Sequence, residues 1–162
     1  MSSGVLVVGY GNPLRTDDGI GPMAAQRLAD DPRLEGATVL TAHQLLPELA
    51  LDVSRAALAV LIDVRADAPP ASVAIESVEP APAGDNGTAW SHHLTPTALG
   101  SLALELYGAA PEMVVVSIGA ASLEVGDRPS AELEAALPRI VDAVVGVVQG
   151  RTRARIVEPS HA

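Results

Sequence analysis

The 162-residue sequence contains no cysteine and no phenylalanine, and aromatic residues make up only 2% of it. Without cysteine, the chain has no thiol nucleophile, disulfide, thiolate metal site or thiol redox switch, so its chemistry depends on oxygen and imidazole groups. With so few aromatic residues, the core must be packed mainly from Val, Leu, Ile and Ala. That composition is typical of α/β sheets.

Positive charge and long apolar runs are also scarce. Ten Lys and Arg residues against 20 Asp and Glu residues give a net charge of −10, so we expect no nucleic-acid partner. No apolar stretch reaches about 18 residues, and the N-terminus does not resemble a signal peptide, so we expect a cytoplasmic protein without a membrane segment. The length predicts one domain, which we place at residues 1–150, followed by a disordered tail at residues 151–162.

The stretch from Val5 to Pro22, VLVVGYGNPLRTDDGIGP, is the one around which the rest of the chain is organised. Its four opening apolar residues predict a strand buried on both faces, two glycines end that strand, and a helical pattern then runs to about Asp30. Asp17 and Asp18 follow this strand at its carboxyl end, where open α/β sheets hold ligands. One of them could simply cap the helix and leave the other free to face a cleft.

A second reading of the same loop is a nucleotide site. Gly9-Tyr10-Gly11 begins a dinucleotide-binding fingerprint, but Leu14 occupies the position of its third glycine and no helix starts directly after it. A Rossmann-like module that binds a nucleotide or another small ligand is therefore one alternative function. A metal-dependent hydrolase of small substrates is the other.

A second apolar strand, predicted for residues 57–63, ends in Asp63. If this strand and the first are parallel neighbours, the carboxylates of Asp18 and Asp63 face the same crevice at the edge of the sheet. The alternative is that Asp63 only starts the next turn, which is a common role for aspartate.

The remaining pattern alternates strands and helices, which indicates an α/β fold. We expect a short strand at 37–41, a half-exposed edge strand at 71–78 and a buried strand at 113–118. We expect helices at 42–56 with Pro47 in the first turn, at 95–107 with Thr95 as cap and Leu99, Leu102 and Leu106 on the core side, and at 131–148 with Ser130 as cap.

Three histidines lie before predicted helices. His92 and His93 end a loop of about a dozen residues and precede a helix N-terminus, which disfavours imidazolium and keeps a histidine in the neutral form that ligates metals. Either residue alone could instead be a surface histidine. For His43 we favour a cap or surface-loop role over that of a ligand.

Three motifs, in this order, resemble those of the hydrogenase maturation proteases. VLVVGYGNPLRTDDGIG resembles that family's GxGN followed by an acidic pair and glycine, LAVLIDVRAD its strand ending in aspartate, and SHHLTPTALGSLALELYG its histidine segment ahead of a helix. The family consists of endopeptidases that trim the C-terminal extension from the large subunit of nickel-iron hydrogenases. The resemblance runs from about Val5 to Val148. It implies a three-layer α/β/α sandwich around a twisted, mostly parallel five-stranded sheet.

The resemblance also implies a site. In that family an acidic residue after the first loop, an aspartate after the central strand and a histidine bind nickel, and these match Asp18, Asp63 and His93, with His92 as the alternative histidine. The nickel belongs to the immature hydrogenase and serves as the recognition element. We therefore expect an aspartic-type endopeptidase with Asp18 and Asp63 as catalytic residues and the large-subunit precursor as partner. Nickel is expected to bind only weakly to the free protein, because the substrate completes the site.

Overall fold

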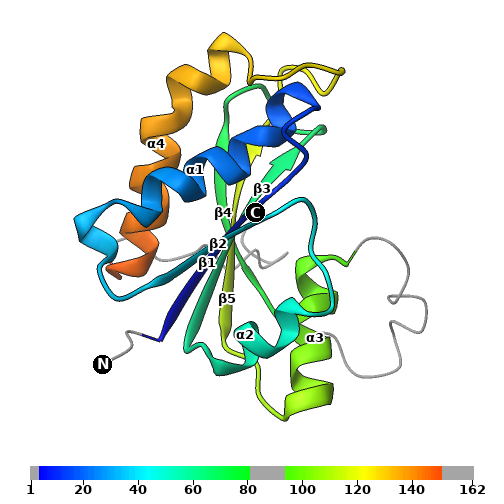
Figure 1. The fold of residues 1–162 in the computed structure, drawn as a ribbon, viewed down its shortest axis with the longest axis vertical. Coiled ribbons are helices and arrows are strands. Elements are labelled where there is room, and N and C mark those ends of the chain that lie inside the picture. The colour runs from blue at the N-terminus through cyan, green and yellow to red at the C-terminus, as the bar shows by residue number, and fades with distance from the viewer. Residues whose placement is uncertain (1–3, 81–93, 151–162) are drawn as a thin grey trace, which may run out of the picture.

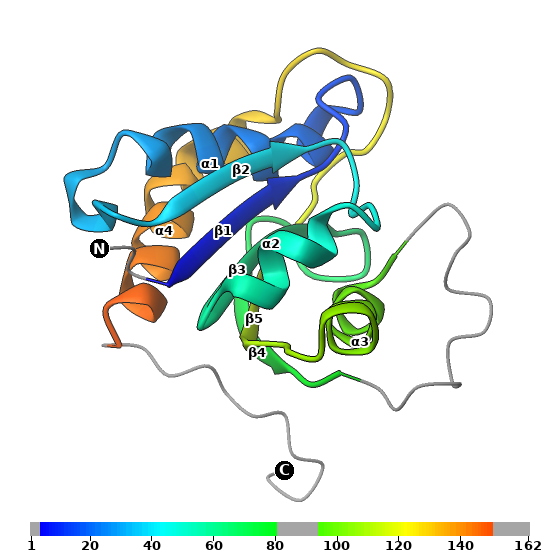
Figure 2. The ribbon, with the colours of Figure 1, turned by 60° about the horizontal axis from the view of Figure 1, so that its bottom comes forward.

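The structure, a computed structural model, describes residues 4–80 and 94–150 of the chain. These residues form one sheet with helices on both faces (Figures 1 and 2). The predictions for His92, His93 and the tail at 151–162 lie outside the described residues and stay predictions.

The sheet has five strands in the spatial order β2-β1-β3-β5-β4. Three of its four strand pairs are parallel, and only β4 runs antiparallel to its neighbour β5. This confirms the predicted mostly parallel five-stranded sheet and the prediction that the segment at 71–78 forms an edge strand. The strands are β1 (Val5–Tyr10), β2 (Thr38–Ala42), β3 (Leu58–Arg65), β4 (Val73–Val78) and β5 (Glu112–Gly119).

Helices α1 and α4 pack on one face of the sheet and α2 and α3 on the other, which gives the predicted three layers (Figure 1). Because side chains alternate along a strand, Val7 and Val60 pack under α1 and α4, whereas Val8 and Leu61 pack under α2 and α3. Each face therefore has its own apolar core. The helices are α1 (Ile20–Ala29), α2 (Leu49–Arg55), α3 (Pro96–Tyr107) and α4 (Ala131–Val148).

The predicted helix caps at Thr95 and Ser130 are confirmed. The Thr95 hydroxyl accepts a hydrogen bond from the Ala98 N–H at 3.1 Å, and the Ser130 hydroxyl accepts one from the Leu133 N–H at 3.4 Å. Each bond satisfies an N–H that has no partner within its helix.

Two helix details were wrong. Leu106 is 53% exposed rather than in the core, because no described residue covers the last turn of α3 and residues 104–108 are all exposed. Pro47 does not lie in the first turn of a helix: α2 begins only at Leu49, and the residues before it form turns, in which the Leu49 N–H bonds to the Leu46 carbonyl.

Helix α1 approaches strand β1 closely because two glycines face each other. A Cβ atom on Gly9 would lie 2.1 Å from the carbonyl oxygen of Gly21, a distance no side chain tolerates. This contact fixes both ends of the loop between β1 and α1, which carries the two adjacent aspartates.

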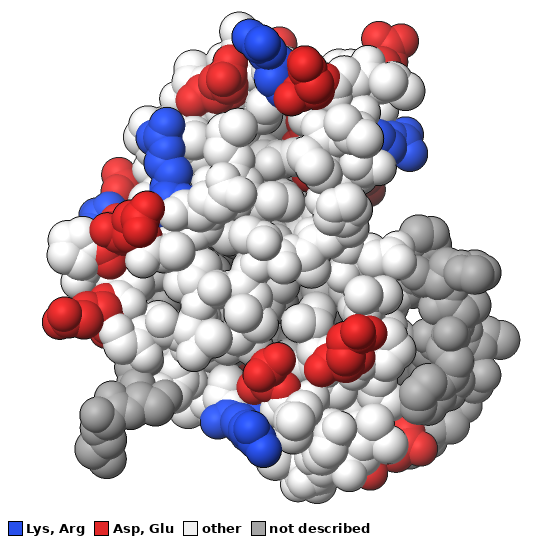
Figure 3. Space-filling model, in the orientation of Figure 1, with Lys and Arg blue, Asp and Glu red and all other residues white. Residues whose placement is uncertain are grey.

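The charged side chains on the face shown in Figure 3 are scattered and of both signs, and arginine side chains do not gather into one patch there. Among the helices in residues 4–80 and 94–150, none combines the length and the apolar character that crossing a membrane requires.

Candidate active site

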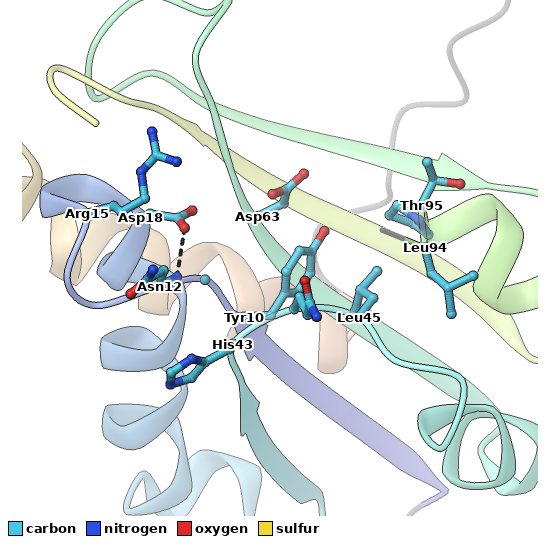
Figure 4. Close-up of a pocket in the computed structure, with 12 residues that line it drawn as sticks. Tyr10, Asn12, Arg15, Asp18, His43, Leu45, Asp63, Leu94 and Thr95 are labelled. Atoms are coloured by element: carbon cyan, nitrogen blue, oxygen red, sulfur yellow. Dashed lines mark hydrogen bonds between the residues drawn. The ribbon is translucent and has the colours of Figure 1, made fainter. Parts of the chain in front are cut away.

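A cleft of about 550 Å³ opens at the carboxyl end of β1 and β3 (Figure 4). Its walls come from the loop after β1, the segment between β2 and α2, the end of β3 and the start of α3. Asp18 and Asp63 both line it, so the structure brings these two predicted site residues together. The lining residues are Tyr10, Gly11, Asn12, Arg15, Asp18, His43, Gln44, Leu45, Asp63, Leu94, Thr95 and Pro96.

Asp18 is held by the backbone of its own loop. It lies in a 3₁₀ turn, Thr16–Gly19, and its Oδ2 atom accepts a hydrogen bond from the Asn12 N–H at 2.7 Å. Gly11 has a φ of +150°, and a Cβ atom there would lie 1.9 Å from the Asp18 carbonyl oxygen. The glycine is therefore required for the loop to bring Asp18 to the cleft.

Asp63 lies within β3, because the strand continues to Arg65 instead of ending at the aspartate. The register pairs it with Ser117 on β5, and the pairing of Gly9 with Ile62 places Tyr10 of β1 beside it on the other side. Figure 4 shows the Tyr10 hydroxyl directed toward the Asp63 carboxylate. Hydroxyl groups from the two neighbouring strands thus flank one carboxylate.

The environment of Asp63 favours its protonated form. Burial raises its pKa, and the negative charge of Asp18 adds to this, whereas a backbone hydrogen bond from Val64, the Tyr10 hydroxyl and the charge of Arg65 oppose the rise only in part. An aspartate with a raised pKa is a better proton acceptor near neutral pH than an ordinary one. Burial, followed by the effect of Asp63, also raises the pKa of Tyr10, so that its hydroxyl remains protonated.

A second cavity, of about 170 Å³, adjoins Asp63 on the side of β5 and β4. Asp63 lines both this cavity and the main cleft. Ser117 also lines the smaller cavity, and its buried Oγ atom has no hydrogen-bond partner among the residues that the structure describes.

Asp17 does not cap the helix, contrary to one of the two sequence readings, and neither does Asp18. Asp17 is fully buried, and its carboxylate accepts hydrogen bonds from the N–H groups of Ala121 at 2.7 Å, Ser122 at 2.8 Å and Ser130 at 2.6 Å. Burial alone would raise its pKa, but these hydrogen bonds outweigh burial and lower it. Because the partners lie more than 100 positions away, no local pattern reveals this role.

The loop at residues 120–130 supports the loop of Asp18 at further points. Thr16 has a φ of +52°, which is unusual for a residue other than glycine. Its N–H donates to the Gly126 carbonyl at 3.2 Å, and its hydroxyl donates to the Glu124 carbonyl. These bonds stabilise a backbone conformation that is unfavourable in isolation.

His43 is an exposed loop residue, as the sequence predicted, and it also lines the cleft. Figure 4 shows its ring on the side of the cleft away from Asp63. Within residues 4–80 and 94–150, no three His, Asp or Glu side chains are grouped closely enough to hold a metal ion, so His43 does not complete a ligand set with Asp18 and Asp63.

The sheet, its helices and a cleft with two carboxylates at the strand ends define the protein first as an α/β protein with an acidic crevice. Its fold is that of the hydrogenase maturation proteases, as comparison with solved structures shows. HybD, a hydrogenase maturating endopeptidase of E. coli, superimposes with a TM-score of 0.70 at 21% sequence identity, covering 96% of this chain and 97% of that one.

Two further solved structures have a similar fold. The HycI maturation protease of Thermococcus kodakarensis gives a TM-score of 0.69 at 18% identity, covering 90% of this chain and 92% of that one. A hydrogenase 2 maturation peptidase from a Thaumarchaeota archaeon gives 0.66 at 23% identity, covering 90% and 97%. The sequence itself matches no protein-family model and no curated protein.

Proposed function

We propose that the protein is an endopeptidase that removes the C-terminal extension from a nickel-iron hydrogenase large-subunit precursor after nickel insertion. The observation that carries this proposal is the meeting of Asp18 and Asp63 in one cleft, within a fold shared with solved hydrogenase maturation proteases over nearly the whole chain. The two residues are separated by 45 positions in sequence: Asp18 lies in the 3₁₀ turn after β1, and Asp63 lies in β3.

The donors suit a nickel ion carried by the substrate. Two carboxylates and one imidazole form a reasonable ligand set for a borderline divalent ion, and three protein ligands leave coordination positions open for the precursor's own groups. In this proposal Asp18 and Asp63 supply the carboxylates and His93 supplies the imidazole. Leu94, the next residue along the chain, lines the same cleft, which supports the choice of this histidine segment.

Peptide hydrolysis then requires a positioned water molecule and a proton acceptor. Because the Asp63 carboxylate has two oxygens, one can bind the metal while the other accepts the proton from water as the hydroxide attacks the scissile carbonyl, and then returns a proton to the leaving amine. Asp18, with one oxygen held by the Asn12 N–H, has its other oxygen available for the substrate's metal. Binding the metal fixes the scissile bond beside the two carboxylates.

The shape of the site favours an extended polypeptide over a compact small molecule. The main cleft and the smaller cavity both have Asp63 in their lining, so we propose that a substrate segment follows a path from the cleft, past Asp63, toward β4. A chain lying along this path would pass Asp63 near its middle. This is the position needed for a cut inside a polypeptide.

The direct test is incubation with a nickel-loaded large-subunit precursor, with loss of its C-terminal peptide followed by mass spectrometry. We expect cleavage by the wild-type protein, none of the nickel-free precursor, and a loss of at least about 100-fold in Asp18→Asn and Asp63→Asn. Asp52→Asn, an exposed aspartate on α2, is the matched control and is expected to cleave normally.

A pair of histidine variants tests the third ligand. His93→Ala is expected to abolish cleavage, whereas His92→Ala is expected to retain it. The reverse result would transfer the ligand role to His92, and full activity in Asp63→Asn would refute the proposed chemistry.

A further inference from the structure

Two large apolar side chains lie exposed at the tips of two adjoining loops. Leu14 is 63% exposed and Val125 is 93% exposed. Leu14 belongs to the loop after β1 and Val125 to the loop at residues 120–130, and the two loops run side by side in Figures 1 and 2. The Gly126 N–H donates to the Leu14 carbonyl at 3.0 Å. We name Leu14 and Val125 together the apolar rim.

The apolar rim lies next to a residue of the cleft wall. Arg15, the residue after Leu14, lines the cleft and forms a parallel bridge with Gly126, the residue after Val125. The Arg15 Nε atom also donates to the Leu123 carbonyl at 3.2 Å. The loop that carries Leu14 therefore also carries Asp18 into the cleft.

The apolar rim is held rigidly although it is exposed. The buried carboxylate of Asp17 bonds to three N–H groups of the second loop, and Thr16 bonds to two of its carbonyls. A rigid surface loses less conformational entropy on binding than a mobile one, so exposed apolar side chains on such a support are suited to docking a partner.

The other exposed large apolar side chains among the described residues lie on α3: Leu104, Leu106 and Tyr107. Helix α3 contributes its first turn to the cleft, through Thr95 and Pro96. Leu104 is eight residues further along, which is about 12 Å at the rise of an α-helix. Leu14 is the chain neighbour of Arg15 in the cleft wall, whereas these three α3 residues lie further from the cleft, so α3 offers a matched control surface.

We propose that the apolar rim docks against an apolar patch on the folded body of the protein substrate, next to the point where its C-terminal extension enters the cleft. This inference rests on the proposed function and deepens it. The cleft recognises a short segment around the scissile bond, whereas a contact on the rim recognises the protein that carries the segment. Its contribution is to substrate affinity and not to the chemical step.

The test measures kcat and KM for removal of the extension from a nickel-loaded precursor of the same organism. In the double variant Leu14→Ser/Val125→Ser we expect KM to rise by at least about tenfold with kcat unchanged, because the contact is outside the reacting centre. Val125→Asp alone is expected to raise KM in the same direction. Leu106→Ser is the control and is expected to match the wild type.

Thermal unfolding of the double variant is expected to match that of the wild type, because both side chains are exposed. A KM within about twofold of the wild type, or a fall in kcat at constant KM, would refute the docking role while leaving the proposed function standing. A wild-type protein that cleaves no nickel-loaded precursor would refute the proposed function and the docking role with it.

Discussion

Replacing Asp17 is expected to destabilise the protein strongly and to disable the cleft without touching any group that lines it. Asp17 is fully buried, and its carboxylate accepts three backbone hydrogen bonds from the loop at residues 120–130. In Asp17→Asn the amide oxygen can still accept, but its NH₂ group must face at least one N–H donor. In Asp17→Ala all three donors lose their partner.

The magnitude follows from the number of donors left without a partner. Each N–H that loses its acceptor costs about 1–3 kcal/mol, so we expect a loss of about 2 kcal/mol for Asp17→Asn, which leaves one donor without a partner, and about 6 kcal/mol for Asp17→Ala, which leaves three. For a chain of this length, 2 kcal/mol corresponds to a fall in Tm of about 4–8 °C. Urea unfolding followed by circular dichroism measures the free energy of unfolding of both variants, with Asp52→Asn as the exposed control.

The pH dependence provides an independent readout. The hydrogen bonds lower the pKa of Asp17 in the folded protein, so its stabilising contribution is fully present above the unfolded pKa of about 3.9 and is lost as the pH falls through the folded value. The stability difference between the wild type and Asp17→Asn is therefore expected to be constant near neutral pH and to shrink in acid. A difference in the free energy of unfolding below about 0.5 kcal/mol at pH 7 would refute the stabilising role of the Asp17 carboxylate.

Three other substitutions test the cleft. Asp63→Asn is expected to raise Tm at pH 7, because the raised pKa of Asp63 means that its ionised carboxylate destabilises the folded protein there. At about pH 3, where the carboxyl group is protonated, Tm is expected to be unchanged. A lower Tm at pH 7 would contradict this. Gly11→Ala is expected to cost more than about 2 kcal/mol and to abolish cleavage because its Cβ would displace Asp18, whereas Gly108→Ala, with open space but a φ of +74°, is expected to cost about 1 kcal/mol in the same urea titration. Tyr10→Phe is expected to move the acid limb of the pH profile of kcat/KM to higher pH, because the Tyr10 hydroxyl lowers the pKa of Asp63; an unchanged limb would show that the hydroxyl does not act on this carboxylate.

Much of the fold could be predicted because its signals are local. The apolar run at the start of β1 and the one that forms β3 identify strands buried on both faces, and Thr95-Pro96 identifies a helix start. The exposure of Leu106 could not be predicted in this way. Helical spacing says which residues share a face, but not whether a neighbouring element extends far enough to cover the last turn.

In the site, too, the roles with local sequence signals could be predicted and the role with distant partners could not. Asp18 and Asp63 could be placed at one edge because Asp18 follows β1 and Asp63 follows the buried residues of β3, and parallel strands bring their carboxyl ends together. The role of Asp17 could not be separated from that of a helix cap, since an aspartate before a helix commonly caps it. Its real partners come from a loop that the sequence marks only as irregular.

The adjacent pair Asp17-Asp18 therefore divides two tasks between chemically identical side chains. The buried carboxylate of Asp17, with its lowered pKa and three N–H donors, stays ionised and anchors the loop at residues 120–130. Asp18 faces the cleft, and only one of its two carboxylate oxygens accepts the hydrogen bond from the Asn12 N–H. Because the 3₁₀ turn directs consecutive residues to different sides, anchoring one fixes the other. The loop at 120–130 is thereby coupled to the position of Asp18, so a partner that contacts the apolar rim contacts the same rigid unit that presents the carboxylate to the substrate.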